Sequence, residues 1–298
     1  MDERIDKDKL ERIKEGKGFI AALDQSGGST PKALLNYGIP EDAYKNDDEM
    51  FDLIHEMRKR VFTSPVFDKR ILGAILFTKT MESKVNDLYT SDYLWNEKRI
   101  VSFLKIDKGL QKEVSGVQLM ADIDDLDEQL DLARRRGIFG TKMRSVIHEA
   151  SKEGIEAVVT QQFNLAKKIC DAGLVPIIEP EVDINSEDKE LCEELLKDQI
   201  KEKLEKWDQK DLIMFKVTIP TINNYYKDLY DYDAVVRVVA LSGGYAIDKA
   251  CELLEKNNNV IASFSRALLE GLSVNQSDEE FDNVLNNSIQ KIYSSSIS

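Results

Sequence analysis

The stretch Leu212-Ile213-Met214-Phe215-Lys216-Val217 is an apolar run with a single lysine inside it. Apolar runs without polar alternation are typical of parallel strands that are buried on both faces of a sheet. Lysine is seldom buried without a partner, because removing its ammonium group from water is costly. The stretch therefore predicts a buried strand in which Lys216 has a specific role.

Seven similar apolar runs occur elsewhere in the chain, and polar segments long enough for helices follow them. Alternating strands and helices imply a parallel sheet, and eight repeats predict an α/β fold of the (β/α)8 or TIM-barrel type. A doubly wound sheet is the alternative, but no predicted strand is followed by G-x-G-x-x-G. The seven runs are Gly18–Leu23, Ile71–Phe77, Val101–Ile106, Gly140–Arg144, Val175–Ile178, Val235–Leu241 and Val260–Phe264.

The length of the chain suits one barrel. It has 298 residues, and a barrel of this type typically needs about 250. No linker interrupts the sequence, so we expect a single domain over residues 1–298. The last 13 residues, NNSIQKIYSSSIS from Asn286, are polar and predict a mobile C-terminal tail.

Composition excludes several classes of partner. The formal net charge is −14, from 55 acidic and 41 basic residues, and a negative field repels nucleic acid and anionic membranes. The apolar runs are shorter than the roughly 20 residues of a membrane span, and the charged segment 1–16 lacks the apolar core of a signal peptide. The odd, widely spaced cysteines Cys170, Cys192 and Cys251 indicate reduced thiols. We therefore expect a cytoplasmic protein whose anionic ligands need a local basic cluster.

Polar residues gather where the predicted strands end, which is where barrel enzymes place their active sites. Lys142 and Arg144 share one face of their strand, and Glu179 and Glu181 share one face of theirs. If both faces point inward, cations and carboxylates converge. The candidate residues at these ends are Asp24, Ser26, Ser29, Lys105, Lys142, Arg144, Glu179, Glu181, Lys216, Ser242, Gly243, Gly244, Ser263, Ser265 and Arg266.

A lysine inside a strand has two interpretations. An isolated one would most simply form a structural salt bridge. Lys105, Lys142 and Lys216 lie on three different predicted strands, however, with carboxylates on two others, and this concentration favours catalysis. Burial and a neighbouring cation both lower the pKa of a lysine side chain, which makes the neutral amine available as a nucleophile.

Two glycine-rich turns precede predicted helices. Ser242-Gly243-Gly244 comes before Ala246–Lys256, and Ser26-Gly27-Gly28-Ser29-Thr30 comes before Pro31–Tyr37. Ordinary turn and capping roles would explain either one. Exposed N–H groups at a helix start also bind phosphate, the loops after strands seven and eight form the usual phosphate site of these barrels, and Arg266 could add a bidentate contact. Two such cradles would suit a bisphosphate.

The two histidines bear on the mechanism. Splitting a β-hydroxy ketone requires an electron sink, which a metal ion or a protonated imine can supply. His55 and His148 fall in segments that we interpret as helical, and neither belongs to a ligand-spaced cluster, so no metal site is expected. The imine remains as the candidate.

Eight ordered motifs identify a family resemblance. They are GKGFIAALDQSGGS, GAILFTKT, LKIDKG, TKMRS, VPIIEPE, MFKVTIP, ALSGG and SFSRAL, and they extend from about Gly16 to Leu269. The chain resembles class I fructose-1,6-bisphosphate aldolases, which work through a Schiff base. The resemblance implies reversible cleavage of fructose 1,6-bisphosphate to dihydroxyacetone phosphate and glyceraldehyde 3-phosphate, in glycolysis or gluconeogenesis, without a metal or other cofactor.

The resemblance also implies roles for the candidate residues. Lys216 would form the imine, Glu179 would act as general acid and base, and Lys142 would balance the charge around it. Asp24 would orient the substrate and support proton transfer at the hydroxyl where the bond breaks. The near phosphate would contact Ser242, Gly243 and Arg266, the far phosphate would contact Ser26, Ser29 and Lys105, and the supporting members would be Glu181, Arg144 and Ser263.

Two features depart from the better-known animal members. Ser265 stands where those proteins have glycine, although its backbone N–H is kept. Those members end in a tyrosine, whereas here Tyr293 is followed by five residues. Two alternative functions stay open: a Schiff-base aldolase for another phosphosugar, and a non-catalytic barrel that binds sugar phosphates or a protein.

Overall fold

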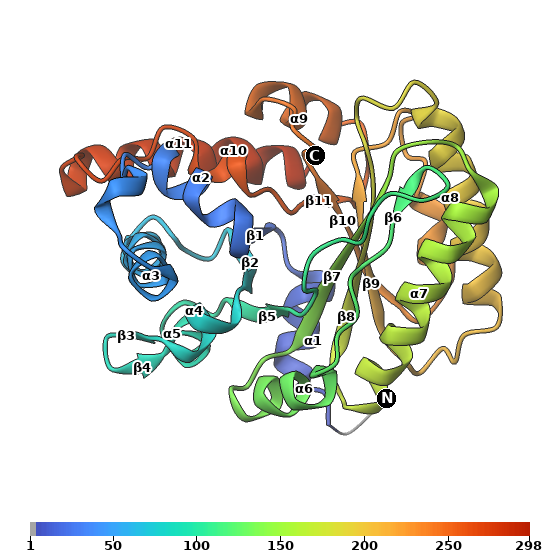
Figure 1. Ribbon diagram of the computed structural model, residues 1–298, viewed down its shortest axis with the longest axis horizontal. Helices are drawn as coiled ribbons and strands as arrows, with labels where there is room; N and C mark the ends of the chain where they lie inside the picture. Colours follow the sequence, from blue (N-terminus) through green and yellow to red (C-terminus); the bar gives the residue numbers. More distant parts are fainter. Residues whose placement is uncertain (1–3) are drawn as a thin grey trace.

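Eight parallel strands form a barrel surrounded by helices (Figure 1). The computed structural model describes residues 4–298, so the first three residues of the charged N-terminal segment lie outside the described residues. The backbone N–H of Ala22 donates to the carbonyl of Phe264 at 3.1 Å and so brings the two edge strands together. The (β/α)8 prediction is confirmed. The strands, in order around the sheet, are β1 (Phe19–Leu23), β2 (Ile71–Leu76), β5 (Val101–Lys105), β7 (Gly140–Ile147), β8 (Val175–Val182), β9 (Ile213–Thr218), β10 (Val235–Leu241) and β11 (Ile261–Ala262).

Strand β8 is four residues longer than the apolar run that predicted it. It pairs in parallel with β7 from Gly140–Val175 to Ile147–Val182. Glu179 therefore lies within a paired strand, opposite Arg144. The pairing fixes the direction of its side chain more firmly than a loop would.

The helices surround the barrel, and α1 packs against β2, β5 and β10 with Ile13 fully buried. Three short strands lie outside the main parallel path: β6 (Val117–Gln118), which pairs antiparallel with β7, and the hairpin of β3 (Lys84–Val85) and β4 (Leu88–Tyr89). The helices are α1 (Lys7–Glu15), α2 (Thr30–Asn36), α3 (Asp47–Thr63), α4 (Thr78–Glu82), α5 (Thr90–Lys98), α6 (Leu126–Arg135), α7 (Lys152–Asp171), α8 (Lys189–Glu205), α9 (Ile247–Leu254), α10 (Arg266–Leu269) and α11 (Asp278–Ser296), with 3-10 turns η1 (Gly27–Ser29), η2 (Glu41–Ala43) and η3 (Lys227–Asp231). Within residues 4–298, none of these helices has the length and apolar character needed to cross a membrane.

The C-terminal segment is a docked helix, so the prediction of a mobile tail from about Asn286 was wrong. Helix α11 begins with a capping box between Ser277 and Glu280 and packs along α9, α10 and β11 (Figure 1). Its few apolar residues recur every three or four positions, so they fall on one face. Ile289 and Ile292 are fully buried there. The polar composition of the segment gave no indication of this apolar face, which depends on the spacing of the apolar residues.

Alternation along the strands sets an apolar layer beneath a charged one. Phe103, Ile177 and Met214 belong to the apolar cluster inside the barrel. The next residues on the same strand faces are Lys105, Glu179 and Lys216, respectively, because side chains two apart share a face. The barrel interior therefore changes from apolar to ionic toward the carboxyl ends of the strands.

Candidate active site

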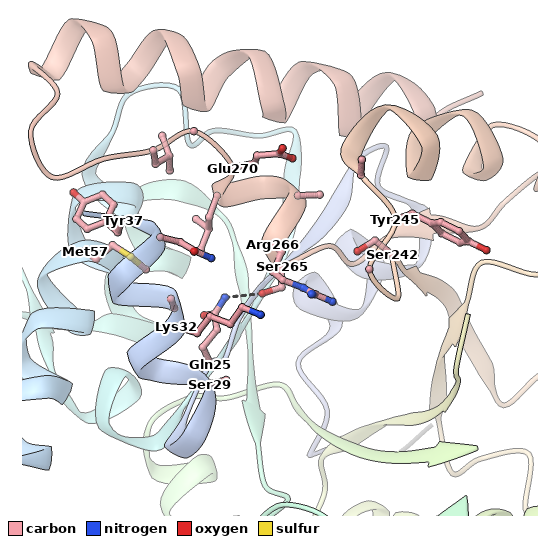
Figure 2. Close-up of a pocket in the computed structure, with 18 residues that line it drawn as sticks. Gln25, Ser29, Lys32, Tyr37, Met57, Ser242, Tyr245, Ser265, Arg266 and Glu270 are labelled. Atoms are coloured by element: carbon pink, nitrogen blue, oxygen red, sulfur yellow. Dashed lines mark hydrogen bonds between the residues drawn. The ribbon is translucent and has the colours of Figure 1, made fainter. Parts of the chain in front are cut away.

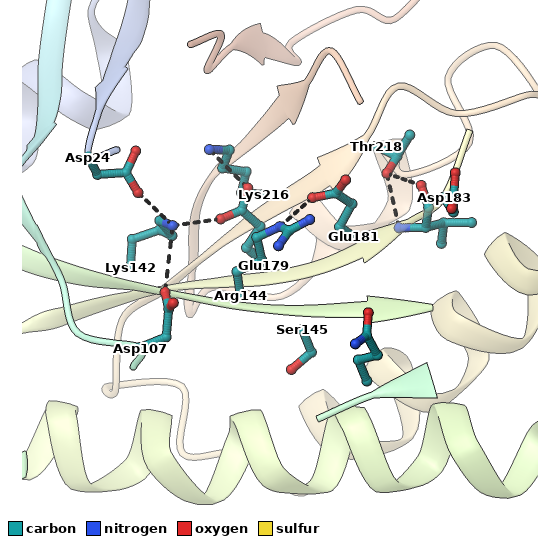
Figure 3. Close-up of polar contacts among 12 residues, drawn as sticks. Asp24, Asp107, Lys142, Arg144, Ser145, Glu179, Glu181, Asp183, Lys216 and Thr218 are labelled. Carbon is teal, nitrogen blue, oxygen red and sulfur yellow. Dashed lines mark hydrogen bonds and ion pairs between the residues drawn. The ribbon is translucent and has the colours of Figure 1, made fainter. Parts of the chain in front are cut away.

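A buried chain of charges joins strands β7, β8 and β9 at the carboxyl end of the barrel (Figure 3). The ammonium nitrogen of Lys216 lies 3.0 Å from Oε1 of Glu179, and that of Lys142 lies 3.1 Å from Oε2. The exposed fractions of Lys216, Glu179 and Lys142 are 4%, 3% and 3%. One carboxylate thus bridges two buried lysines. The structure brings these three candidate residues together.

Lys142 is surrounded by carboxylates. In addition to Glu179, its ammonium group lies 2.7 Å from Asp24 and 3.7 Å from Asp107. Burial by itself would lower the pKa of Lys142, but the charges of Asp24, Glu179 and Asp107 outweigh it and raise that pKa. Burial would likewise raise the pKa of Asp24, yet the charges of Lys142 and Lys216 hold it well below its usual range. Lys142 is therefore a fixed cation, and Asp24 is a fixed anion.

Lys216 has a different environment. Within residues 4–298, Glu179 is the one carboxylate in ion-pair contact with it. Three carboxylates therefore hold the ammonium group of Lys142, whereas one holds that of Lys216. The geometry thus separates two lysines that have similar burial.

Asp107 is a site residue that sequence reasoning missed. It lies just after β5, is 8% exposed, and holds Lys105 by a 2.8 Å ion pair and a 2.8 Å bond to its own carbonyl. The signal was present in the motif Leu-Lys-Ile-Asp, because residues two apart share a strand face. Lys105 is consequently an internal partner of Asp107 as well as a candidate for phosphate binding.

A second ion pair lies further along the same two strands. The guanidinium Nε of Arg144 lies 2.6 Å from Oε2 of Glu181. Arg144 retains 36% side-chain exposure, against 3% for Lys142. The predicted inward faces of β7 and β8 thus present one deeply buried cation and one accessible cation.

A cavity of about 700 Å³ opens between α2 and α10. Figure 2 shows Ser29, Ser242, Ser265 and Arg266 around it, together with Lys32. Its wall includes Ser29, Ser242, Gly244, Ser265 and Arg266, all predicted for substrate binding. Ser26, Gly243 and Ser263 do not line it. Ser26 precedes the turn η1, where its backbone N–H and carbonyl both bond the hydroxyl of Ser29, and Ser263 is buried with no partner for its hydroxyl among the described residues.

The glycine turn after β10 favours glycine at two positions, because Gly243 and Gly244 both have positive φ, the latter +117°. Gly243 has φ +59°, and a Cβ there would lie 2.5 Å from Cγ2 of Ile184. At Gly244 a Cβ would lie 3.6 Å from Nη2 of Arg266, so the guanidinium group rests against this turn. The side chain of Arg266 forms no hydrogen bond or ion pair with any residue in 4–298. An unpaired guanidinium beside exposed backbone is a suitable anion site.

The histidines stand apart from this cluster. His55 lies in α3 as predicted. His148 was placed in helical surroundings, which is wrong: it follows β7 directly and bonds Asp183 at 3.1 Å and Gln118 at 3.0 Å. Within residues 4–298, no group of three or more His, Cys, Asp or Glu side chains is arranged to hold a metal ion.

The fold and the site together define a (β/α)8 enzyme built on a buried lysine and its carboxylate partner. The family model for class-I fructose-bisphosphate aldolase matches residues 7–224. The fructose-bisphosphate aldolase class 1 of Clostridium acetobutylicum is 60% identical over 289 residues, which cover 97% of this chain and 98% of that protein. The chain belongs to the class I fructose-bisphosphate aldolase family, as the sequence motifs predicted.

A solved structure agrees at the level of the fold. Fructose-bisphosphate aldolase of Plasmodium falciparum, determined in complex with TRAP and a small-molecule inhibitor, superimposes with a TM-score of 0.77. The match covers 98% of this chain and 96% of that one, at 19% identity. The barrel is thus shared with a protein of very different sequence.

Proposed function

We propose that this chain cleaves fructose 1,6-bisphosphate reversibly to dihydroxyacetone phosphate and glyceraldehyde 3-phosphate through an imine on Lys216. Family membership supports a lyase of this class. The 3.0 Å contact between Lys216 and Glu179, beside a Lys142 that is locked as a cation, carries the assignment of residues. The protein would then act in glycolysis or gluconeogenesis, in the cytoplasm.

Imine formation needs a proton shuttle, and Glu179 is placed for it. Transfer of a proton from Lys216 to Glu179 leaves a neutral amine, which adds to the substrate ketone to give a carbinolamine. Glu179 then returns a proton to the departing hydroxyl, which leaves as water and gives the protonated imine. The fixed charge of Lys142 stabilises the ionised form of Glu179 between these steps.

Carbon–carbon cleavage uses the imine as the electron sink. The hydroxyl at the carbon to be released loses its proton, the adjacent carbon–carbon bond breaks, and its electron pair moves into the protonated imine to give an enamine. Asp24, kept ionised by Lys142, would orient that hydroxyl and support its deprotonation. Protonation of the enamine carbon and hydrolysis of the resulting imine then release dihydroxyacetone phosphate and restore the amine of Lys216, so the reaction balances without a metal or a redox cofactor.

The two phosphates would occupy opposite sides of the barrel mouth, where the cavity between α2 and α10 presents Arg266 and Ser242 for one phosphate and Ser29 for the other. Arg266, the Ser242–Gly244 turn, Ser265 and Ser263 would serve the phosphate near the ketone. Ser26, Ser29 and Lys105 would serve the far phosphate. These groups would form the local basic cluster that a chain of net charge −14 needs for an anionic substrate.

Borohydride reduction in the presence of fructose 1,6-bisphosphate tests the proposal. The reduced adduct should appear on the peptide that contains Lys216, and chelators should leave turnover intact. An adduct on another lysine would overturn the assignment of Lys216. Binding of the sugar phosphate without any adduct would favour the non-catalytic barrel, and an adduct only with other phosphosugars would favour an aldolase of different substrate range.

A further inference from the structure

Arg58 is a buried cation that the chemistry above does not use. It lies in α3 with 0% exposure and forms no ion pair with any residue in 4–298. Its guanidinium donates to Oγ1 of Thr80 at 2.6 Å, to the carbonyl of Gln25 at 2.5 Å and to Oε1 of Gln25 at 3.2 Å. Burying a charge is costly, and the carboxylate of Asp24 offsets this cost only from beyond ion-pair distance. The fold nevertheless places this charge against Gln25, the residue that follows Asp24.

The contact with Arg58 decides how the Gln25 amide is oriented. A guanidinium can only donate hydrogen bonds, so the oxygen of the Gln25 carboxamide faces Arg58 and the NH₂ group faces away. That NH₂ group donates to the hydroxyl of Ser265 at 2.6 Å (Figure 2). The buried cation therefore directs a hydrogen bond at one specific partner, 240 positions along the chain.

This hydrogen bond lies in the wall of the cavity between α2 and α10. Gln25 immediately precedes the Ser26–Ser29 turn, and Ser265 immediately precedes Arg266 at the start of α10. Both side chains line the cavity. The contact thus joins the loop assigned to the far phosphate to the segment assigned to the near phosphate. Glycine at position 265 would have no side chain to make it.

We propose that Arg58, Gln25 and Ser265 form a positioning bridge, the Gln25 bridge, that sets the spacing of the two phosphate loops and so favours a bisphosphate over a monophosphate. The inference rests on the proposed function, because it uses the phosphate assignments made there. A ligand that engages both loops gains from their being held at the right separation in advance. A ligand with one phosphate contacts one loop, so its binding changes little when the position of the other loop changes.

A double-mutant cycle tests the bridge. The variants are Gln25→Leu, Ser265→Ala and the double variant, assayed with fructose 1,6-bisphosphate and fructose 1-phosphate. Each single change should lower the ratio of kcat/KM for the bisphosphate to that for the monophosphate by roughly 3- to 10-fold, the worth of one neutral hydrogen bond. The double variant should lose no more than the larger single loss, because both changes remove the same contact.

Gln161→Leu is the matched control. Gln161 is also half-buried, and both ends of its carboxamide hydrogen-bond the backbone of Met120, at 3.0 Å each. Its loss should affect the thermal unfolding midpoint and leave the substrate ratio unchanged. Arg58→Lys keeps the charge and offers fewer hydrogen-bond donors. In the folded variant, the ratio of kcat/KM for the bisphosphate to that for the monophosphate should fall, as it does in Gln25→Leu.

The outcomes separate the bridge from the proposed function. Additive losses in the double variant, or equal losses on both sugars, would overturn the bridge, since the residues would then act independently or on stability alone. An unchanged ratio with normal imine trapping on Lys216 would also overturn the bridge while leaving the proposed function standing. Failure of the unmodified protein to form an adduct with either sugar would instead remove the proposed function.

Discussion

Lys216 and Glu179 face each other across neighbouring strands, with 3.0 Å between Nζ and Oε1, at 4% and 3% exposure. The second oxygen of Glu179 lies 3.1 Å from Lys142. The carboxylate thus lies between a lysine that contacts one carboxylate and a lysine that contacts three. This asymmetry underlies the first two predictions.

Glu179→Gln should lower kcat by about 10²- to 10⁴-fold, the usual contribution of a general acid–base group. The amide keeps the shape and one hydrogen bond to Lys216 but cannot carry the proton. Substrate binding, measured by equilibrium titration, should survive. Glu181→Gln, which changes the neighbouring carboxylate paired with Arg144, is the control and should cost much less. Equal kcat values for Glu179→Gln and the unmodified protein would remove Glu179 from this role.

Lys142→Met should destabilise the fold strongly. It leaves Asp24, Asp107 and Glu179 buried together without their shared cation, and breaking a buried pair from one side typically costs about 3–5 kcal/mol. Urea unfolding at neutral pH measures the loss. Lys249→Met is the surface control, because among the described residues that lysine pairs only with exposed Glu252. Similar stabilities of the two variants would contradict the ionic cluster.

Asp24→Asn should reveal the pH dependence of the same cluster. The folded protein holds the pKa of Asp24 below its usual range, so its charge contributes stability above the unfolded pKa of about 3.9. That contribution is lost as the pH falls through the lower, folded value. The difference in unfolding free energy between the unmodified protein and the variant should therefore be large at pH 7 and shrink below about pH 4. A difference that grows on acidification would contradict the pKa direction.

Arg266→Ala should weaken the binding of fructose 1,6-bisphosphate and fructose 1-phosphate alike, by roughly 10- to 150-fold, if the residue clamps the phosphate near the ketone. The change should appear mainly in the KM for each sugar. Lys249→Ala, which removes an exposed cation of α9 outside the cavity, is the charge control. A loss confined to the bisphosphate would reassign Arg266 to the far phosphate.

Ile289→Ala and Ile292→Ala should each cost about 2–5 kcal/mol of stability, because both side chains are fully buried on the inner face of α11. Deletion of residues 286–298 should accordingly unfold or strongly destabilise the protein. Asn287→Ala, on the exposed face of the same helix, should be near neutral. A stable, fully active truncation would return this segment to the role of a dispensable tail.

Local sequence determined the barrel and much of its chemistry. Eight apolar runs predict eight strands, since each run needs burial on both faces wherever it lies. Period-two alternation predicts that Lys142 and Arg144 face one way and that Glu179 and Glu181 do the same, because the strand backbone itself imposes this geometry. The same rule could have found Asp107 from Lys105.

Only the tertiary structure decided how many carboxylates surround each lysine, because these carboxylates come from separate strands. Asp24, Asp107 and Glu179 meet at Lys142, and Glu179 alone reaches Lys216 among the described residues. Arg58 looks like any cation of an amphipathic helix until α3 packs over Gln25. The face of α11 is likewise buried only because α9, α10 and β11 offer a matching surface. The spacing of residues along the chain predicts which side chains share a face of a strand or helix. Their burial and electrostatic environment depend on segments that are far apart in the chain.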